Sequence, residues 1–337
     1  MTTSFFQRRC ATTALLALAM TAAPLWTASG AARAQTAAAT AQPKIAIALF
    51  GPHPSLQQVV DGFKQEIAAQ GIVATYDEGN VNFDRTLAPQ LLQRMAAGDP
   101  TLMLTVTTPM AQTAKRALAS RTFPIVFAPV TDPVSAKLVP SWDKGDVLMT
   151  GVSNLPDLDQ TCEFVKQLVP AAKRLAILYN PGDDSDVAFV NALEKIAPKH
   201  ALALEKVGVD NANDIPARVQ STQGKADALF IPASSLLQPA SAAIASTANR
   251  IKMPTFNSNT AGVIGHQFLA AYSVDWTRVG INGGRQAAQI LKGKKAEDIA
   301  ISLPARSDHE IKISGQRMKD LGLTLPDALK NCNCVVN

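Results

Sequence analysis

Strand-like and helix-like stretches alternate along this chain, and that alternation limits the available folds more than any other feature. Four apolar, strand-like runs open the sequence, at residues 44–49, 72–76, 102–106 and 124–128. Stretches with helical spacing separate them, at residues 55–70, 84–97 and 108–120. A strand, a helix and a second strand in this order form a parallel sheet with helices on both faces. The first part of the chain is therefore predicted to be an α/β unit.

The same alternation restarts after a strand-like stretch at residues 147–153. Helical spacing recurs at residues 158–169, 187–196, 215–223 and 239–250. Strand-like runs recur at residues 174–179, 203–209, 228–231 and 254–256. A strand at 267–272, a helix at 275–291 and a last strand at 310–314 follow both units. The chain is thus predicted to contain two similar α/β units, each of domain size.

The run at residues 102–106 is apolar throughout, as in a strand buried on both faces, and leads directly into a helix. Thr108 stands where an N-cap belongs, and Pro109 where the first helical residue belongs. Backbone N–H groups at a helix start are unpaired and carry the positive end of the helix dipole. We expect this turn to form one wall of a ligand cleft that takes a carboxylate or phosphate.

Polar side chains follow the carboxyl ends of strands in both units, which is where ligands bind in open parallel sheets. Each of these side chains is also typical of a helix cap or turn. Spread over two units, they indicate a cleft between two lobes. The predicted ligand-binding residues are His53, Thr107, Thr108, Met110, Thr131, Asp132, Asn180, Asp183, Ser185, Ser234, Ser235, Asn257 and Asn259.

The first 34 residues have the features of a signal peptide. Arg8 and Arg9 precede an apolar run at residues 14–22, and Ala-Arg-Ala at 32–34 fits a cleavage site that leaves Gln35 first. The apolar run is too short for a membrane anchor. No Phe-Leu pair follows the two arginines, which favours the general secretory route over twin-arginine export. We therefore expect an exported, periplasmic protein.

Removal of this segment changes the charge of the chain. The segment holds three arginines and no acid, so the formal charge falls from +5 to +2. A nearly neutral protein without a basic cluster gives no reason to expect a nucleic-acid partner. The remaining length of about 300 residues suits one large or two medium α/β domains.

Three cysteines lie beyond the signal segment: Cys162, Cys332 and Cys334. Cys162 lies on an apolar helix face, where a buried structural thiol is expected. Cys332 and Cys334 could bind a metal or one of them could pair with Cys162, but two ligands are too few for a zinc site. The preferred interpretation is an ordinary C-terminal tail.

Catalytic and cofactor motifs are absent from the sequence. It contains no G-x-S-x-G, no G-x-G-x-x-G and no G-x-x-x-x-G-K-[ST], and its four histidines are scattered. The prediction is therefore a protein that is not an enzyme, with no catalytic residue, no metal and no cofactor.

Several motifs in a fixed order resemble one known family. They are His53-Pro54, Thr108-Pro109-x-Ala111-Gln112, PIVF at 124–127 with VTDPV at 130–134, LYNPG at 178–182, Tyr272-x-x-Asp275, and LGL-x-LP at 321–326. Over residues 44–329 the chain resembles the periplasmic substrate-binding proteins of ABC transporters, whose members include aromatic amino-acid binders.

The resemblance implies a type I periplasmic binding protein fold. Two Rossmann-like lobes with parallel sheets would be joined by three crossings of the chain. Lobe 1 would comprise residues 43–151 and 271–297, and lobe 2 residues 152–270 and 298–334. The late helix would thus return to the first lobe and the last strand to the second.

The resemblance also implies a function. The protein would be the solute-binding component of an ABC importer, a monomer that closes on a small polar solute, an amino acid or carboxylate, and delivers it to an inner-membrane permease. The Thr-Pro helix start would suit an α-carboxylate, and loops of the second lobe would face the amino end.

The chain departs from the family pattern in that second lobe. Ser185-Asp186 replaces a common Asn-Ser, Ser234-Ser235 a common Asp-Asn, and Asn259 a common Asp. An Asp at position 259 would pair with an ammonium group, whereas an Asn cannot. A neutral or purely acidic solute therefore fits as well as an amino acid.

Two alternative functions remain at this level. The first is a periplasmic sensor subunit of the same fold, which signals to a membrane partner. The second is a periplasmic enzyme that uses Asp132, Asp183 or His53 as acid or base, although no motif requires one.

Overall fold

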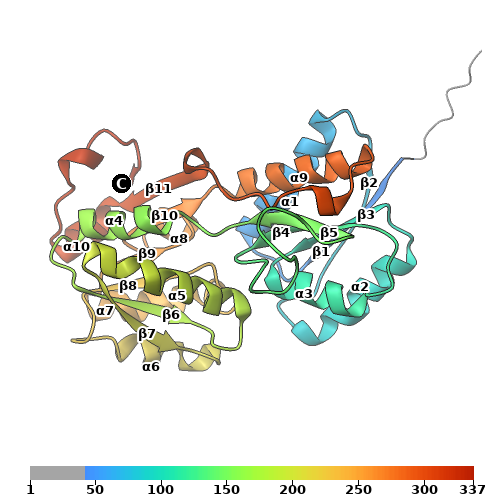
Figure 1. The fold of residues 1–337 in the computed structure, drawn as a ribbon. Helices are drawn as coiled ribbons and strands as arrows, with labels where there is room; N and C mark the ends of the chain where they lie inside the picture. The colour runs from blue at the N-terminus through green and yellow to red at the C-terminus, as the bar shows by residue number, and fades with distance from the viewer. Residues whose placement is uncertain (1–41) are drawn as a thin grey trace, which may run out of the picture. The chain divides into compact units, whose positions relative to one another are not determined.

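The computed structural model describes residues 42–337, and the predicted signal peptide lies outside these residues. Two sheets organise the described chain (Figure 1). The first has the strand order β2-β1-β3-β4-β5 and is parallel throughout. Its strands are β1 (Lys44–Leu49), β2 (Thr75–Asn80), β3 (Leu102–Val106), β4 (Ile125–Val130) and β5 (Met149–Ser153).

Helices cover both faces of this first sheet because its central strands are apolar on both sides. Along β1, Ile45 and Ile47 pack against the helices α1 (Pro54–Ala69) and α9 (Trp276–Leu291). Ala46 and Ala48 face the opposite way, toward α2 (Ala88–Ala97), its 3₁₀ lead-in η1 (Arg85–Leu87) and α3 (Thr108–Ala117). The first unit therefore matches the predicted α/β layering.

Two glycines allow α1 and α9 to approach closely. A Cβ on Gly280 would lie 2.1 Å from the carbonyl oxygen of Val59, and one on Gly62 would lie 2.3 Å from that of Thr277. Because real Cβ atoms do not approach this near, no larger residue fits at either position without moving a helix. This contact fixes the late helix α9 on the first sheet.

The second sheet has the strand order β12-β11-β10-β9-β8-β6-β7. Its strands are β6 (Arg174–Tyr179), β7 (Ala203–Gly208), β8 (Ala228–Ile231), β9 (Thr255–Asn257), β10 (Ala270–Val274), β11 (His309–Ser314) and β12 (Val335–Val336). All neighbours are parallel except β10 and β11, which are antiparallel.

Helices also cover both faces of the second sheet. One face carries α4 (Leu158–Leu168), α5 (Asp184–Ile196) and α10 (Gly315–Leu321). The other carries α6 (Ile215–Gln220), α7 (Ser241–Arg250) and the short α8 (Ala261–Ile264). Short 3₁₀ turns complete the structure: η2 (Ala197–His200), η3 (Ala212–Asp214), η4 (Ala296–Asp298), η5 (Arg306–Asp308) and η6 (Asp327–Leu329).

The chain crosses between the two sheets three times: from β5 to α4, from β10 to α9, and from η4 to β11. Two short segments differ from the predicted division. Residues 271–274 belong to β10 and so to the second sheet. Residues 299–302 stay with the first sheet, where the Ser153 N–H donates to the Ser302 carbonyl at 2.8 Å. The crossings themselves agree with the predicted type of fold.

Edge strands and helix starts were less predictable than the central strands. Strand β2 begins three residues after the predicted start at residue 72. It is polar and has β1 as its single neighbour, so no apolar pattern marks its bounds. The residue capping α3 is Thr107 and not the predicted Thr108, and its side chain makes no capping hydrogen bond.

The cysteine interpretation was wrong in one respect. Cys332 and Cys334 form a disulfide with each other, a pairing that the sequence did not suggest. Cys162, on the buried face of α4, is a free thiol within the core, as expected, and burial raises its pKa to about 12. Among the helices of residues 42–337, none has both the length and the apolar character that crossing a bilayer requires.

Candidate functional site

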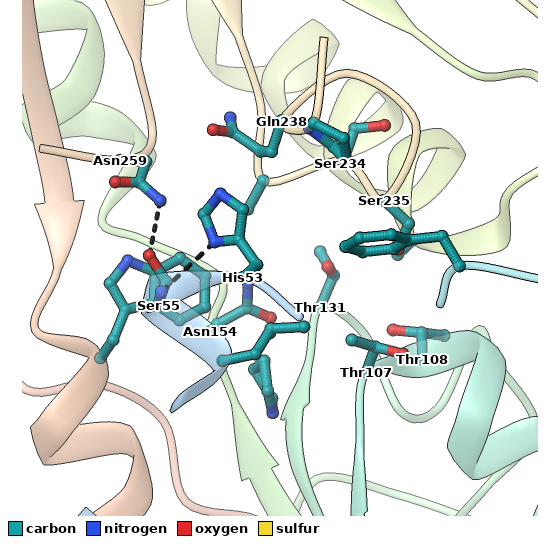
Figure 2. A pocket seen from close by; sticks show the side chains of 17 residues that line it. His53, Ser55, Thr107, Thr108, Thr131, Asn154, Ser234, Ser235, Gln238 and Asn259 are labelled. Carbon is teal, nitrogen blue, oxygen red and sulfur yellow. Dashed lines mark hydrogen bonds between the residues drawn. The ribbon is translucent and has the colours of Figure 1, made fainter. Parts of the chain in front are cut away.

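The main pocket lies where strand ends of both sheets face each other (Figure 2). Its empty volume is about 540 Å³, part of which is open to solvent. Eight of the residues predicted to bind ligand line it: His53, Thr107, Thr108, Thr131, Ser185, Ser234, Ser235 and Asn259. Residues that lie up to about 200 positions apart in the chain thus share one cavity wall, as the strand-end rule implies.

Two other predicted residues have different roles. Met110 is fully buried and packs in the core between the first sheet and α2 and α3. Each helical residue is rotated by about 100° from the last, so a position two residues after Thr108 faces the sheet. Asp132 accepts the N–H groups of Val134 and Ser135 at 3.0 and 2.9 Å, which makes it a turn residue.

The remaining three shape the loops behind the pocket. The Asn180 side chain accepts the Gly182 N–H at 2.9 Å. Asp183 is the N-cap of α5 and accepts the Ser185 N–H at 2.9 Å. Asn257 accepts hydrogen bonds from the Gln238 side chain and the Asn259 N–H, both at 2.9 Å. These residues hold pocket-lining neighbours in place but do not line the main pocket themselves.

His53 caps α1 and presents its ring to the pocket. Its Nδ1 accepts the Ser55 N–H at 3.3 Å, which satisfies one free donor at the helix start (Figure 2). Burial lowers the pKa of His53, so the neutral ring is favoured. With Nδ1 acting as acceptor, the proton lies on Nε2. His53 therefore offers one hydrogen-bond donor to a ligand.

Thr107 has a strained backbone next to the pocket. Its φ of 93° and ψ of 155° lie in a region that glycine normally occupies, and it is β-branched. Its hydroxyl is buried and has no hydrogen-bond partner in residues 42–337. Thr108 follows at the first turn of α3, where backbone N–H groups are free. The end of β3 thus presents unsatisfied donors to the cavity.

The sequence did not single out several residues that line the pocket. Asn154 and Trp276 come from two of the crossings between the sheets. Phe83 and Leu56 add apolar surface, and Gln238 adds a polar side chain from the loop after β8. A signal did exist for the crossing residues, because any segment that joins two lobes must pass the gap between them.

The main pocket is nearly neutral. Among its lining residues, His53 is the single titratable side chain, and no Lys, Arg, Asp or Glu is present. Hydroxyl, amide and imidazole groups alternate with the rings of Phe83 and Trp276. Such a lining suits a small molecule with an apolar or aromatic body and a few polar groups.

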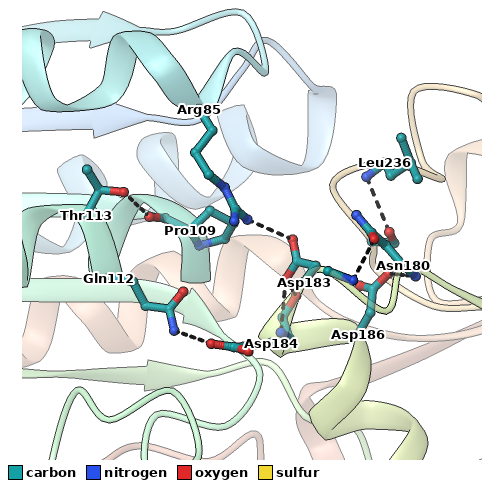
Figure 3. A network of polar contacts seen from close by, with 12 residues as sticks. Arg85, Pro109, Gln112, Thr113, Asn180, Asp183, Asp184, Asp186 and Leu236 are labelled. Atoms are coloured by element: carbon teal, nitrogen blue, oxygen red, sulfur yellow. Dashed lines mark hydrogen bonds and ion pairs between the residues drawn. The ribbon is translucent and has the colours of Figure 1, made fainter. Parts of the chain in front are cut away.

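Three contacts connect the rims of the two sheets around the pocket. The Asn259 side chain donates to the Ser55 hydroxyl at 2.5 Å (Figure 2). The Gln112 Nε2 donates to Asp184 at 2.7 Å (Figure 3). Arg85 lies 3.5 Å from the Asp183 carboxylate. Each pair joins an element of the first sheet's layer to a loop or helix of the second, so these contacts bridge the two layers.

Comparison with known proteins identifies similar sequences. A family model for ABC transporter substrate binding proteins matches residues 44–334. A tyrosine-binding protein of Clostridioides difficile (strain R20291) is 28% identical over 290 residues, which cover 84% of this chain and 81% of that protein.

Solved structures are similar over comparable lengths. The ABC domain from Streptococcus pneumoniae in complex with L-Trp gives a TM-score of 0.80 at 27% identity, covering 86% of this chain and 97% of that one. The ligand-free, open structure of a substrate binding protein with adhesive properties from Clostridium difficile gives 0.67 at 25% identity, covering 85% and 96%.

Proposed function

The chain belongs to the family of ABC transporter substrate binding proteins, and on that premise we propose that it binds an aromatic amino acid between its two lobes. Its fold is of the type I periplasmic binding protein class, with two lobes and parallel sheets. The observation that carries the proposal is the neutral pocket that strand ends of both sheets form.

The lining of this pocket supports an aromatic solute. Phe83 and Trp276 provide ring surface, and aromatic pairs stabilise a contact by about 0.5–1.5 kcal/mol beyond simple burial. The start of α3 and the free hydroxyl of Thr107 provide donors for a carboxylate. The names of the similar proteins support the same class, since one is a tyrosine-binding protein and another was solved with L-Trp.

The lobe arrangement supports a closed state as the binding form. The match is better to the structure in complex with L-Trp, at a TM-score of 0.80, than to the ligand-free, open structure, at 0.67. The contacts between Asn259 and Ser55 and between Gln112 and Asp184 would break if the lobes separated. Closure around the solute would give a permease a distinct surface to recognise.

We further propose that the protein is exported to the periplasm and delivers its solute to an ABC permease in the inner membrane. The predicted signal peptide and the family membership support this role. No catalytic step is proposed, because the candidate acids and base have structural roles: His53 and Asp183 cap helices, and Asp132 is a turn residue.

Isothermal titration calorimetry tests the proposal directly. The purified protein would be unfolded in guanidinium chloride and refolded to remove any bound solute, then titrated with L-tyrosine, L-tryptophan and L-phenylalanine. At least one should bind with micromolar or tighter affinity and raise the melting temperature. L-Glutamate and glucose serve as controls. If none of the aromatic amino acids binds, the proposed ligand class is wrong.

A matched pair of variants on α3 tests the carboxylate wall. Thr108→Val removes a pocket-lining hydroxyl while keeping the side-chain shape. Loss of one hydrogen bond to a charged group should weaken binding by about 1.5–3 kcal/mol. Thr113→Val lies on the same helix but bonds the Pro109 carbonyl away from the pocket, so it should leave affinity unchanged. Equal affinities for all three proteins would remove Thr108 from the site.

A further inference from the structure

A second cavity, here called the inner pocket, adjoins the main pocket. The two pockets have Thr131, Asn154, Ser185, Ala233 and Trp276 in common. The inner pocket has an empty volume of about 350 Å³, part of which is open to solvent, and unlike the main pocket it has an acidic residue in its wall. This residue is Asp186, on α5.

Asp186 is an acid buried without a cation. It is 1% exposed, and within residues 42–337 no Lys, Arg or His forms an ion pair with it. The nearby Arg85 pairs with Asp183 instead (Figure 3). The Asn180 N–H donates to Asp186 Oδ2 at 2.7 Å. A carboxylate accepts up to about four hydrogen bonds, so the bonds from Asn180, Ser234 and Ser185 leave capacity for one more from a ligand.

The electrostatics of this position disfavour an unpaired negative charge. Burial, and then the neighbouring Asp183 carboxylate, raise the pKa of Asp186 to about 7. Hydrogen bonds from Ser234, Asn180 and Ser185 act in the opposite direction but do not outweigh burial. A cation that enters the inner pocket would stabilise the ionised form.

Two further groups in the inner pocket also lack partners. The hydroxyl of Ser258 and the Nε1–H of Trp276 are buried, and neither makes a hydrogen bond in the described part of the chain. Both residues are more than nine-tenths buried. Buried polar groups are nearly always satisfied in native proteins, so such groups around one cavity indicate a missing polar occupant.

We propose that the inner pocket binds the primary ammonium group of the ligand, with Asp186 as its counter-ion and the Ser258 hydroxyl as a second acceptor. The Nε1–H of Trp276 is then available to the adjacent carboxylate of an amino acid. This inference rests on the proposed function and deepens it, because it requires an amine on the solute. It also replaces the expectation, drawn from Asn259, that neutral or purely acidic solutes fit equally well.

A purely structural role for Asp186 makes a different prediction. Its bond to the Asn180 N–H joins the start of α5 to the end of β6, and an amide oxygen could accept the same bond. Asp186→Asn would then be neutral for binding. If the carboxylate pairs with an ammonium group, the same variant must lose affinity, and it must do so only for ligands that carry the amine.

The test titrates wild type, Asp186→Asn and Asp210→Asn with two probes. These are L-tyrosine and 3-(4-hydroxyphenyl)propanoate, which lacks the amino group. Asp210 is exposed on the same lobe and provides the matched control. Wild type and Asp210→Asn should bind L-tyrosine at least 100-fold more tightly than the analogue. Asp186→Asn should lose at least 100-fold for L-tyrosine and keep its affinity for the analogue within threefold.

Either of two results overturns the inference while leaving the proposed function intact. One is Asp186→Asn binding L-tyrosine as wild type does, and the other is wild type binding both probes equally. If Asp186→Asn does not fold, the comparison of the two probes on wild type decides alone. If wild type binds neither L-tyrosine nor L-tryptophan, a screen of other primary amines follows. If another primary amine binds and its binding depends on Asp186, the inference stands and the aromatic ligand class is wrong. If no primary amine binds, the inference and the proposed ligand class are both wrong.

Discussion

The ligand-free Asp186→Asn variant should be more stable than wild type at alkaline pH, although it binds its ligand less well. In wild type, burial and the Asp183 carboxylate move the pKa of Asp186 from 3.8 to about 7. A shift of this size destabilises the ionised folded state by on the order of 4 kcal/mol. Because the amide also needs buried hydrogen bonds, we expect a gain of about 2–4 kcal/mol in the free energy of unfolding at pH 8.

The sign of the pH dependence follows from proton linkage. The folded protein holds the Asp186 proton more tightly than the unfolded chain does, because its pKa is raised. The stabilisation that the folded protein gains from the Asp186 proton is therefore complete below pH 3.8 and is lost as pH rises through about 7. The difference between the variant and wild type should thus be small near pH 4, grow between pH 4 and 7, and level off above pH 8.

Urea denaturation of ligand-free protein at pH 5, 6, 7 and 8 measures this difference. Asp210→Asn, which changes an exposed acid, should follow wild type at every pH. A variant that is less stable than wild type at pH 8 would contradict the burial of an unpaired carboxylate. So would a difference that does not change with pH, since it would have to arise from packing and not from ionisation.

Three further predictions follow from the geometry. Gln112→Ala removes the contact to Asp184 that joins the two lobes, so ligand affinity should fall several-fold with little change in the ligand-free melting temperature; an unchanged affinity would show that the contact does not hold the closed state. Thr107 has a backbone conformation that glycine adopts without strain, so Thr107→Gly should raise the free energy of unfolding by about 1 kcal/mol in urea titrations and weaken ligand binding. A destabilised variant would argue against strain at this position. Gly280→Ala would place a Cβ 2.1 Å from a carbonyl oxygen of α1 and should lower the free energy of unfolding by about 3 kcal/mol or more in the same titrations. Gly265→Ala has room for a Cβ and should change this free energy little. Similar values for both variants would contradict the close helix contact.

Much of the fold follows from patterns that are local in the chain. Continuous apolar runs such as Leu102–Val106 predict central parallel strands, because such strands are buried on both faces. The edge strand Thr75–Asn80 is polar, and its position depends on pairing with β1, so local pattern located it poorly. The bounds of elements with one neighbour depend on that neighbour and not on their own residues.

Parts of the candidate site were predictable for a related reason. Residues within a few positions after a strand, such as His53, Thr108 and Ser234, lie at the carboxyl edge of a parallel sheet, and these line the main pocket. Met110 did not, because its direction depends on the phase of α3 against the sheet. Strand order and helix phase therefore decide which strand-end residues reach a ligand.

The sequence by itself determined that two parallel α/β units would place polar strand ends at an edge, since this follows from the order of apolar and polar residues. Tertiary structure alone decided that Asp186 is buried beside Asp183 and faces a cavity with Trp276. The physical reason is that burial, electric field and hydrogen-bond satisfaction are properties of a group's surroundings. For Asp186 those surroundings come from the loop after β8, from β10 and from α9 as well as from its own helix, and the chain must fold before they exist.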